Sequence, residues 1–482
     1  MKPDQTRGLI PQLSFLYVCH NVLLNRITPK LDSWAQERGI GGLVLGCGKG
    51  GQTMDINFSM CQLLEKARDR FNSGAICQGD ILKCHDFIPW GGALKSFLRR
   101  DVEVAIAVAL IRLHRCPQVY LMVGDCLSDV VVRSRGGLTG SSSASAMARV
   151  CIEDPFTMAE PSLVGSFRVS QDIFLPFMAW SDNLYVTGDK IENAVSNFES
   201  VSFYLDSEFG FKIKSDSRTV IPARCRKFGE YILNVHGNAW LCTDTCKSSG
   251  NFLTSTGEPN TECSALFSAW NSAFWSNCKV FTNRRAPPAS RMKVWKRLCY
   301  SLADHRLPLL SPAVKTAESL EASCNKIIKF IAGVRRLDGD DAKSFVLRRN
   351  SVVSDLKHNC GFDIRSRWAI RIVSWVEHMF RHQDRPSFQF LNVQTDPWLR
   401  ERRREAGLSG PSRTLRGGAT NTRHGPGAPL RWGNTWFEHI LFSETGWHNP
   451  TKMRSQTKFN AEFLRANFLL RDSLSLLTTH VT

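Results

Sequence analysis

Two short apolar segments, each with one acidic residue, most constrain the fold of this chain. Residues 75–81 are typical of a buried strand with Asp80 near its end, and residues 174–186 are typical of a hairpin with Asp182 at its tip. Helical patterns occupy the sequence around them, so we expect an α+β fold in which helices pack against an antiparallel sheet. A strand end and a neighbouring hairpin tip can then bring two distant acids together.

The rest of the pattern predicts mainly helices, from apolar residues at helical spacing. The expected helices cover residues 12–28, 53–70, 90–115, 144–151, 189–208 and 361–382, with others between 262 and 355. Hairpins are expected around residues 119–132 and 231–241, and a strand at 211–213. Pro29 should break or kink the first helix, and Gly210 should end the helix that begins near residue 189.

Net charge narrows the class of partner. The chain has 62 Lys and Arg against 44 Asp and Glu, a net charge of +18. Such an excess favours polyanions through counterion release, so nucleic acid is the first partner to consider; a charge that serves only solubility is an equal alternative. The composition, 43% hydrophobic and 22% charged, excludes a chain that is disordered throughout.

The cysteines and apolar runs indicate a reducing, intracellular location. Sixteen cysteines are scattered, and no second pair with zinc-ligand spacing follows Cys242 and Cys246, so we expect reduced thiols. The N-terminus lacks the apolar region of a signal peptide, and the longest apolar run, residues 102–111, is too short to span a bilayer. We expect a protein of the nucleus, the cytoplasm or both, without membrane contact.

The two acids suit phosphoryl transfer to a growing nucleic acid. That reaction uses two divalent ions about 3.5–4 Å apart, and hard cations prefer carboxylate oxygens. Each feature also has a simpler explanation: Asp80 as a cap or turn residue, Asp182 as ordinary turn chemistry, and the glycine-rich residues 135–143 as a plain loop. The order of the three along the chain favours the catalytic interpretation.

Taken in order, these segments resemble the palm motifs of non-LTR retrotransposon reverse transcriptases. Residues 79–89 are similar to Asp-Ile-x-Lys-Ala-Phe-Asp, residues 135–145 to Arg-Gly-Val-x-Gln-Gly, and residues 180–183 to the Tyr-Ala-Asp-Asp hairpin. Three flanking segments add to the resemblance, namely 48–55 (Gly-x-x-x-x-Thr-x-Asp), 210–218 (Gly-Leu, strand and Lys) and 375–381 (Trp-x-Gly-His-x-x-Arg). The resemblance covers about residues 5–440.

The resemblance implies a right-hand polymerase fold and an RNA-directed DNA polymerase. The implied parts are partial fingers (1–75), palm (76–245), helical thumb (246–355), a basic Arg/Trp helical region (356–399), an Arg/Gly/Pro-rich linker (400–432) and a C-terminal tail (433–482). The implied partners are an RNA template, a DNA primer or target and deoxynucleoside triphosphates. The implied cofactor is Mg²⁺, as two ions, or Mn²⁺.

Positions carried over from the family give the expected site. Asp80 and Asp182 would bind metal with the carbonyl of Ile81, and Asn183 stands where the family has a second hairpin acid. The expected nucleotide and template contacts are His85, Gly136, Thr139, Gly140 and Arg218. Further nucleic-acid contacts are expected from Arg365, Arg367, Trp368, Arg371, Trp375 and Arg381. This mixture of cations and aromatics suits RNA binding, and equally an ordinary helix with buried Trp.

Four positions depart from the family pattern, which indicates a partly degenerate copy. Asn183 replaces Asp, Thr139 replaces Gln, His85 replaces an aromatic residue and Trp180 replaces Tyr, whereas Lys83 and Asp86 are retained. An amide lacks the charge of a carboxylate. The upstream fingers segment of the family has no counterpart here, so we expect a truncated element. An active reverse transcriptase and a catalytically inactive nucleic-acid-binding derivative remain open; motif order and charge disfavour a generic α+β protein.

Overall fold

The computed structural model describes residues 14–46, 51–70, 74–117, 120, 122–123, 126–130, 132–138, 141–166, 175–223, 228–255, 260–300, 305–310 and 314–389. The chain divides into two compact units. Unit 1 comprises residues 1–256 and 384–389, and unit 2 comprises residues 257–383 and 390–482. The linker and tail expected at 400–432 and 433–482 lie outside the described residues.

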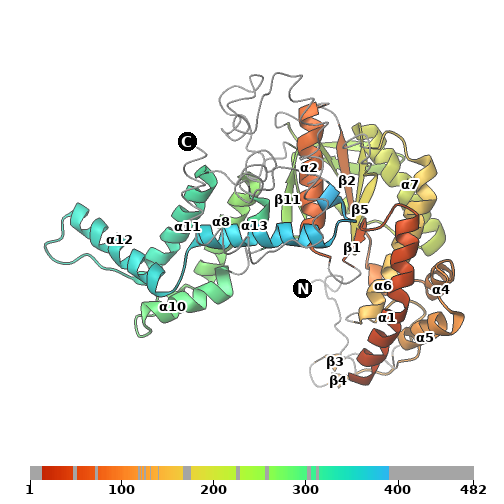
Figure 1. The fold of residues 1–482 in the computed structure, drawn as a ribbon, viewed down its shortest axis with the longest axis horizontal. Coiled ribbons are helices and arrows are strands. Elements are labelled where there is room, and N and C mark those ends of the chain that lie inside the picture. The colour runs from red at the N-terminus through yellow and green to blue at the C-terminus, as the bar shows by residue number, and fades with distance from the viewer. Residues whose placement is uncertain are drawn as a thin grey trace. The chain divides into compact units, whose positions relative to one another are not determined.

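A seven-stranded sheet forms the centre of unit 1 (Figure 1), in the order β1-β5-β6-β2-β7-β9-β8. The strands are β1 (Val44–Leu45), β2 (Ala75–Asp80), β5 (Phe177–Trp180), β6 (Asn183–Gly188), β7 (Thr219–Pro222), β8 (Tyr231–Val235) and β9 (Asn238–Cys242). Pairing is antiparallel except between β1 and β5 and between β7 and β9. Two small hairpins accompany it, β3–β4 (Met122–Val123, Cys126–Leu127) and β10–β11 (Thr245–Ser248, Asn251–Thr254).

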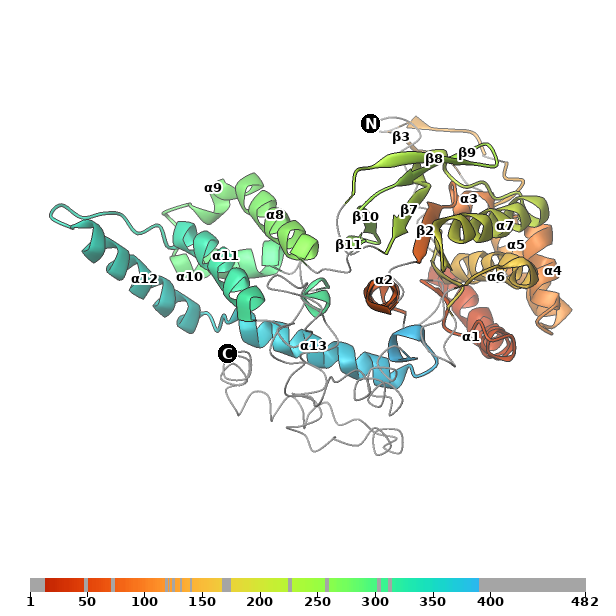
Figure 2. The same ribbon diagram turned by 90° about the horizontal axis from the view of Figure 1, so that it is seen from above.

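Helices cover both faces of this sheet. The helices of unit 1 are α1 (Ser14–Glu37), α2 (Thr53–Arg70), α3 (Cys84–Phe87), α4 (Trp90–Leu98), α5 (Val104–Arg115), α6 (Ser142–Ala159), α7 (Ile191–Phe209) and the short turns η2 (Glu160–Ser162) and η3 (Ser215–Ser217). Figure 2 shows α6 and α7 on one face and α2 on the other. The mixture of helices and a largely antiparallel sheet confirms the predicted α+β class.

Helix α7 packs tightly against the central strand because β2 contains a glycine where the two meet. Val195, Phe198 and Val201 on the inner face of α7 are fully buried. A Cβ atom on Gly79 would lie 2.5 Å from Phe198 Cζ, so any side chain there would push the helix off the sheet. As predicted, α7 ends at Gly210, which has the left-handed φ of 66°.

Pro29 does not break α1, because the second half of this helix is buried against the neighbouring helices, and this packing outweighs the lost backbone hydrogen bond. Two other local predictions for unit 1 were wrong. The helix expected over 90–115 is two helices, because the chain turns at Asp101, where φ is 54°. Residues 211–213 form no strand, and only Ile213 makes a bridge, to Ile81. The β10–β11 hairpin was not predicted.

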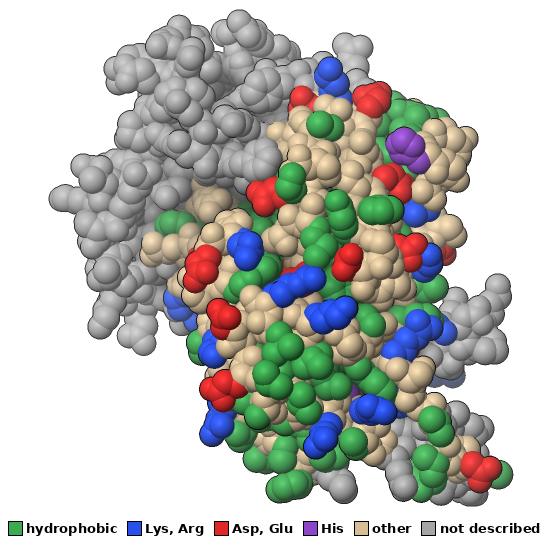
Figure 3. All heavy atoms as spheres, turned by 90° about the vertical axis from the view of Figure 1, so that its right-hand side faces the viewer, with side chains coloured by type: hydrophobic (Ala, Val, Ile, Leu, Met, Phe, Trp, Pro, Cys, Tyr) green, Lys and Arg blue, Asp and Glu red, His purple; other side chains and the backbone are tan. Residues whose placement is uncertain are grey.

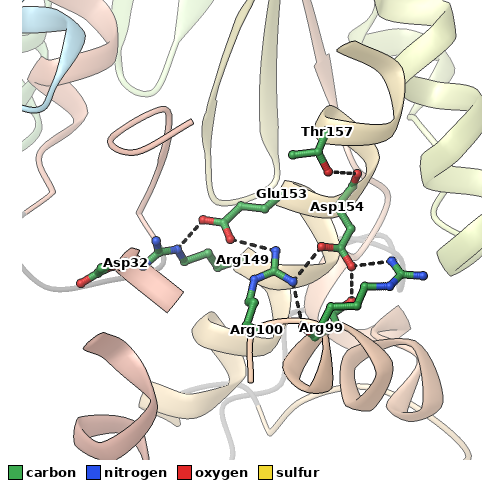
Figure 4. A network of polar contacts seen from close by, with 8 residues as sticks. Asp32, Arg99, Arg100, Arg149, Glu153, Asp154 and Thr157 are labelled. Atoms are coloured by element: carbon green, nitrogen blue, oxygen red, sulfur yellow. Dashed lines mark hydrogen bonds and ion pairs between the residues drawn. The ribbon is translucent and has the colours of Figure 1, made fainter. Parts of the chain in front are cut away.

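A buried ionic network joins α1, α4 and α6 (Figure 4). The Arg100 side chain is 0% exposed and forms ion pairs with Glu153 (3.1 Å) and Asp154 (2.7 Å), both 1% exposed. Its guanidinium lies 3.7 Å from the centre of the Trp34 ring. Arg149 extends the network from Glu153 to an aspartate on α1 at 2.6 Å. Charges this deeply buried are tolerated because each one faces an opposite charge.

Unit 2 is helical over its described residues. Its elements are α8 (Asn260–Ser276), α9 (Cys278–Phe281), α10 (Pro288–Trp295), the π-helical turn η4 (Lys296–Tyr300), η6 (Leu307–Leu309), α11 (Val314–Ala332), α12 (Ala342–Asn359) and α13 (Ile364–Arg381). Trp270, Phe274, Trp295 and Ile328 are fully buried in its core. Residues 257–383 carry roughly twice as many Lys and Arg as Asp and Glu.

Charge is mixed on the face of unit 1 seen in Figure 3. Basic and acidic side chains alternate there, and apolar side chains gather toward its lower part. None of the helices within the described ranges is long and apolar enough to cross a membrane.

Candidate active site

Strand pairing brings the two predicted acids to the same end of the sheet. Asp80, the last residue of β2, pairs in register with Asn183, the first residue of β6. The next backbone amide, that of Ile81, donates to the carbonyl oxygen of Asp182 at 2.8 Å. Residues far apart in the sequence therefore form one corner, which we call the acidic corner: Asp80, Asp182 and Asn183.

The hairpin tip is held in a conformation that the sequence disfavours. Trp180 pairs with Asn183, so Ser181 and Asp182 form a two-residue turn, and Ser181 has a φ of 53°. Left-handed φ at that position of a hairpin turn suits glycine better than serine. Strand β1 holds the turn from outside, because the Ser181 amide donates to the carbonyl of Leu45 at 2.9 Å. Local strain of this kind is common at functional sites.

Asp80 has a cationic neighbour that the sequence did not reveal. The Lys214 ammonium group contacts Asp80 Oδ2, and the two side chains are 29% and 21% exposed. The Lys214 backbone amide also donates to the Asp80 carbonyl at 2.9 Å. The sequence alone does not show this contact. It follows from the Ile81–Ile213 bridge, which places the next residue, Lys214, beside Asp80.

The acidic corner has oxygen donors suited to one hard cation. Asp80 and Asp182 supply carboxylates and Asn183 supplies an amide oxygen; Asn183 Nδ2 lies 3.5 Å from Asp182 Oδ1. Within the described part of the chain, no group of three or more His, Cys, Asp and Glu side chains is arranged to hold a metal. Mg²⁺ is commonly held by one or two carboxylates together with substrate phosphates, so the chemistry of these donors suits Mg²⁺ or Mn²⁺. Both metal ions, and the contact of the Ile81 carbonyl with a metal, remain sequence predictions.

The glycine-rich loop lies against the segment that follows β2. Gly136 and Gly137 donate to the carbonyls of Ile88 and His85 at 2.8 and 2.7 Å. Gly136 has a φ of 93°, and a Cβ atom there would lie 2.6 Å from the Asp86 carbonyl oxygen. Only glycine permits this approach, so the loop and His85 are neighbours through their backbones. Thr139 and Gly140, the other expected contacts in this loop, lie outside the described residues.

Arg218 is engaged in a polar network with residues of β9 and α7. Its guanidinium donates to Asn238 Oδ1 and lies 5.9 Å from the Trp240 ring centre. Asn238 Nδ2 and Trp240 Nε1 both donate to Glu199 at 3.0 Å. These contacts hold the Arg218 side chain, and its expected contact with the nucleotide or template stays a prediction.

A buried row of hydrogen bonds through His114, Ser143 and His20 supports the glycine-rich loop at Leu138. The Leu138 amide donates to His114 Nδ1 at 2.9 Å, so the His114 ring proton is on Nε2 and is donated to Ser143 Oγ, also at 2.9 Å. The Ser143 hydroxyl then donates to His20 Nδ1 at 2.5 Å. Burial, followed by the charges of His20, Arg133 and His85, lowers the pKa of His114 from 6.5 to about 3. Sequence patterns gave no signal for this chain of contacts, because it joins three helices.

The stability of unit 1 should fall in mild acid because of His114. The unfolded imidazole gains a proton as the pH drops below 6.5, whereas the folded one resists protonation until a pH of about 3. Stability from this group is complete above pH 6.5 and is lost as the pH falls toward 3. Each pH unit in that range costs about 1.4 kcal/mol. Urea unfolding from pH 7.5 to 5.5 should show this loss.

The matched variants for this prediction are His114→Gln and His236→Gln. His236 is exposed in the β8–β9 turn and has no part in the network. His114→Gln should flatten the pH dependence, and His236→Gln should keep it. An unchanged slope in His114→Gln would contradict the assignment.

The aromatic residues expected to stack on bases in unit 2 are core residues. Trp368 is 0% exposed and donates its indole N–H to the Leu307 carbonyl at 2.8 Å, and Trp375 is 2% exposed. The alternative explanation, a helix with buried Trp, therefore holds for both rings. Arg381 is exposed, while Arg367 and Arg371 are half-buried; the Arg365 side chain is outside the described set.

Asp55, from the upstream signature, has a structural position. It is fully buried at the start of α2, where Oδ2 accepts from Arg385 (2.8 Å) and the Gln52 amide (3.0 Å), and Oδ1 accepts from Ser387 (2.8 Å). The segment 384–389 thereby belongs to unit 1, although it follows α13 of unit 2 in sequence.

Comparison with known proteins gives only distant structural likenesses. No family model matches the chain, and no curated protein matches it. Among solved structures, telomerase from Candida tropicalis, in complex with a fragment of telomeric RNA, is 10% identical with a TM-score of 0.34, covering 71% of this chain and 56% of that one. Telomerase from Candida albicans, in a similar complex, is 11% identical with a TM-score of 0.36, covering 76% and 56%. The chain thus spans a little over half of each telomerase chain, and likenesses this distant assign neither an activity nor a partner.

Proposed function

We propose that this chain is a reverse transcriptase of the non-LTR retrotransposon type, which copies RNA into DNA from a DNA primer. One observation carries the proposal: the β2–β6 register joins Asp80, Asp182 and Asn183 at one strand end. The proposed fold is the right hand, with fingers and palm in unit 1 and a helical thumb in unit 2. The motif order in the sequence supports it.

In this function the acidic corner would bind and orient the reacting groups. Asp80 and Asp182 would hold Mg²⁺ or Mn²⁺, which activates the primer hydroxyl and neutralises the triphosphate. His85 would lie beneath the sugar of the incoming deoxynucleoside triphosphate, and the close approach of the Gly136 backbone would leave room for the base pair. Catalysis of this kind depends on positioning and on charge neutralisation.

The excess positive charge of unit 2 would bind the template and primer. Lys and Arg outnumber Asp and Glu about twofold in residues 257–383, and phosphate contacts supply most non-specific affinity for nucleic acid. With Trp368 and Trp375 in the core, this binding would rest on cationic side chains, including exposed Arg381, and would weaken steeply with salt.

A second function, nucleic-acid binding without turnover, is favoured by two observations. Lys214 contacts one of the two carboxylates, and Asn183 supplies no charge where the family has an acid. Both reduce the negative charge available to a cation. This alternative retains template binding and lacks nucleotide transfer.

The test is incorporation of single labelled deoxynucleotides opposite RNA templates that differ in one base. The proposal expects the native chain to add the nucleotide complementary to each template base, in Mg²⁺ or Mn²⁺. Addition that ignores the template would contradict template-directed synthesis. Salt-sensitive binding of the same primer–template without addition would favour the second function.

A further inference from the structure

We propose that Lys214 is a built-in competitor for the metal at the acidic corner: its ammonium group occupies the Asp80 carboxylate that a divalent cation would need. The inference rests on the proposed function, since it concerns the metal affinity of that same corner. It predicts that Lys214 weakens the binding of divalent ions, and that replacing this residue strengthens the binding.

The backbone around Lys214 fixes where its side chain starts. Its amide donates to the Asp80 carbonyl at 2.9 Å. Ser217 locks the segment in place, because its hydroxyl donates to the Lys214 carbonyl at 2.8 Å and accepts from the Asp80 amide at 2.9 Å. With the Ile81–Ile213 bridge just before it, this segment is tied to the end of β2 at several points. These contacts fix the backbone of Lys214 at a position from which its ammonium group reaches the Asp80 carboxylate.

Charge explains why this contact should matter for a cation. The corner holds two carboxylates, Asp80 and Asp182, and Asn183 contributes none. The Lys214 charge offsets one of these two negative charges. A divalent ion on Asp80 must either displace the ammonium group or bind beside a like charge, and both weaken its binding.

A neighbouring lysine shows what an ordinary surface pair looks like in the same segment. Lys212 contacts Asp206, and these side chains are 66% and 45% exposed, against 29% and 21% for Lys214 and Asp80. Exposed pairs are screened by water and contribute little. Lys212 therefore provides a control of the same residue type, two positions away and outside the corner.

The experiment is a Mn²⁺ titration of the full chain, with free Mn²⁺ followed by electron paramagnetic resonance. Lys214→Gln, which removes the charge, should bind one Mn²⁺ at least about tenfold more tightly than the native chain, a difference of about 1.4 kcal/mol. Lys214→Arg, which keeps the charge, and Lys212→Gln should both bind as the native chain does. Adding Asp182→Ala to Lys214→Gln should abolish the gain. Thermal melting followed by circular dichroism verifies that each variant is folded.

The outcomes separate this inference from the proposed function. Equal Mn²⁺ affinity in the native chain and Lys214→Gln, with both weakened by Asp182→Ala, would overturn the inference and leave the metal corner standing. A gain in Lys214→Gln that survives Asp182→Ala would place the ion elsewhere and also overturn it. No measurable Mn²⁺ binding by any folded variant would count against both the inference and the proposed polymerase.

Discussion

Replacing Arg100 by methionine is expected to destabilise unit 1 by about 3 kcal/mol, the lower end of the range for breaking a buried ion pair. The change removes the arginine that two buried carboxylates share and leaves each of them with one arginine, Arg149 or Arg99. Glu153 and Asp154 are both 1% exposed, and Arg100 lies between them. Methionine can fill much of the space against the Trp34 ring. The lost free energy of unfolding therefore measures mainly the removal of the charge and not the loss of packed volume. Urea unfolding at pH 7.5 measures it.

The matched control for Arg100 is Arg99→Met. Arg99 also pairs with Asp154, at 2.9 Å, but its side chain is 44% exposed. A partly exposed pair is screened by solvent, so this variant should lose no more than about 1 kcal/mol. Equal losses in the two variants would contradict the view that the buried network (Figure 4) depends on Arg100.

Asp55→Asn is expected to detach the segment 384–389 from unit 1. The substitution keeps the shape of the side chain and removes its charge, which leaves the buried Arg385 guanidinium without its carboxylate. Breaking a buried ion pair from one side costs about 3–5 kcal/mol. Arg385 also packs on Gly42, where a Cβ atom would lie 3.1 Å from Arg385 Cγ. The segment should therefore open locally before unit 1 unfolds.

Limited chymotrypsin digestion tests this prediction, because the buried Phe388, which precedes Gln389, is a cleavage site within the segment. The native chain should resist cutting there, whereas Asp55→Asn should be cut early. Asp384→Asn is the control, since Asp384 is exposed and adjacent to Arg385. Cleavage after Phe388 at the native rate in Asp55→Asn would show that the buried pair does not hold the segment.

The sequence was informative where structure follows from local pattern. The acid-ended strand β2, the β5–β6 hairpin and helix α7 with its glycine stop all follow from periodicity over a few residues. The pairing of β2 with β6 could be expected because strands separated by helices still tend to meet in one sheet.

What could not be predicted depends on contacts between distant residues. Pro29 is tolerated because α1 packs on α6, a fact that no window around Pro29 contains. Asp55 and Arg385 are 330 positions apart. Lys214 faces Asp80 because the Ile81–Ile213 bridge and the hydrogen bonds beside it join two distant segments, and the motif comparison therefore directed attention to Arg218 instead. The two tryptophans of α13 fit a stacking pattern, and their burial became evident only in the packed unit.

The most direct test of the central claim is primer extension on an RNA template in Mg²⁺ by the native chain, Asp182→Ala and Asn183→Asp. Loss of a metal-binding carboxylate costs several kcal/mol of transition-state stabilisation, and each 1.4 kcal/mol is tenfold in rate, so Asp182→Ala should extend at least about a hundredfold more slowly. Asn183→Asp, which adds a charge next to Asp182, should extend faster than the native chain. Extension by Asp182→Ala at the native rate would contradict the claim that the acidic corner is the site of nucleotide transfer.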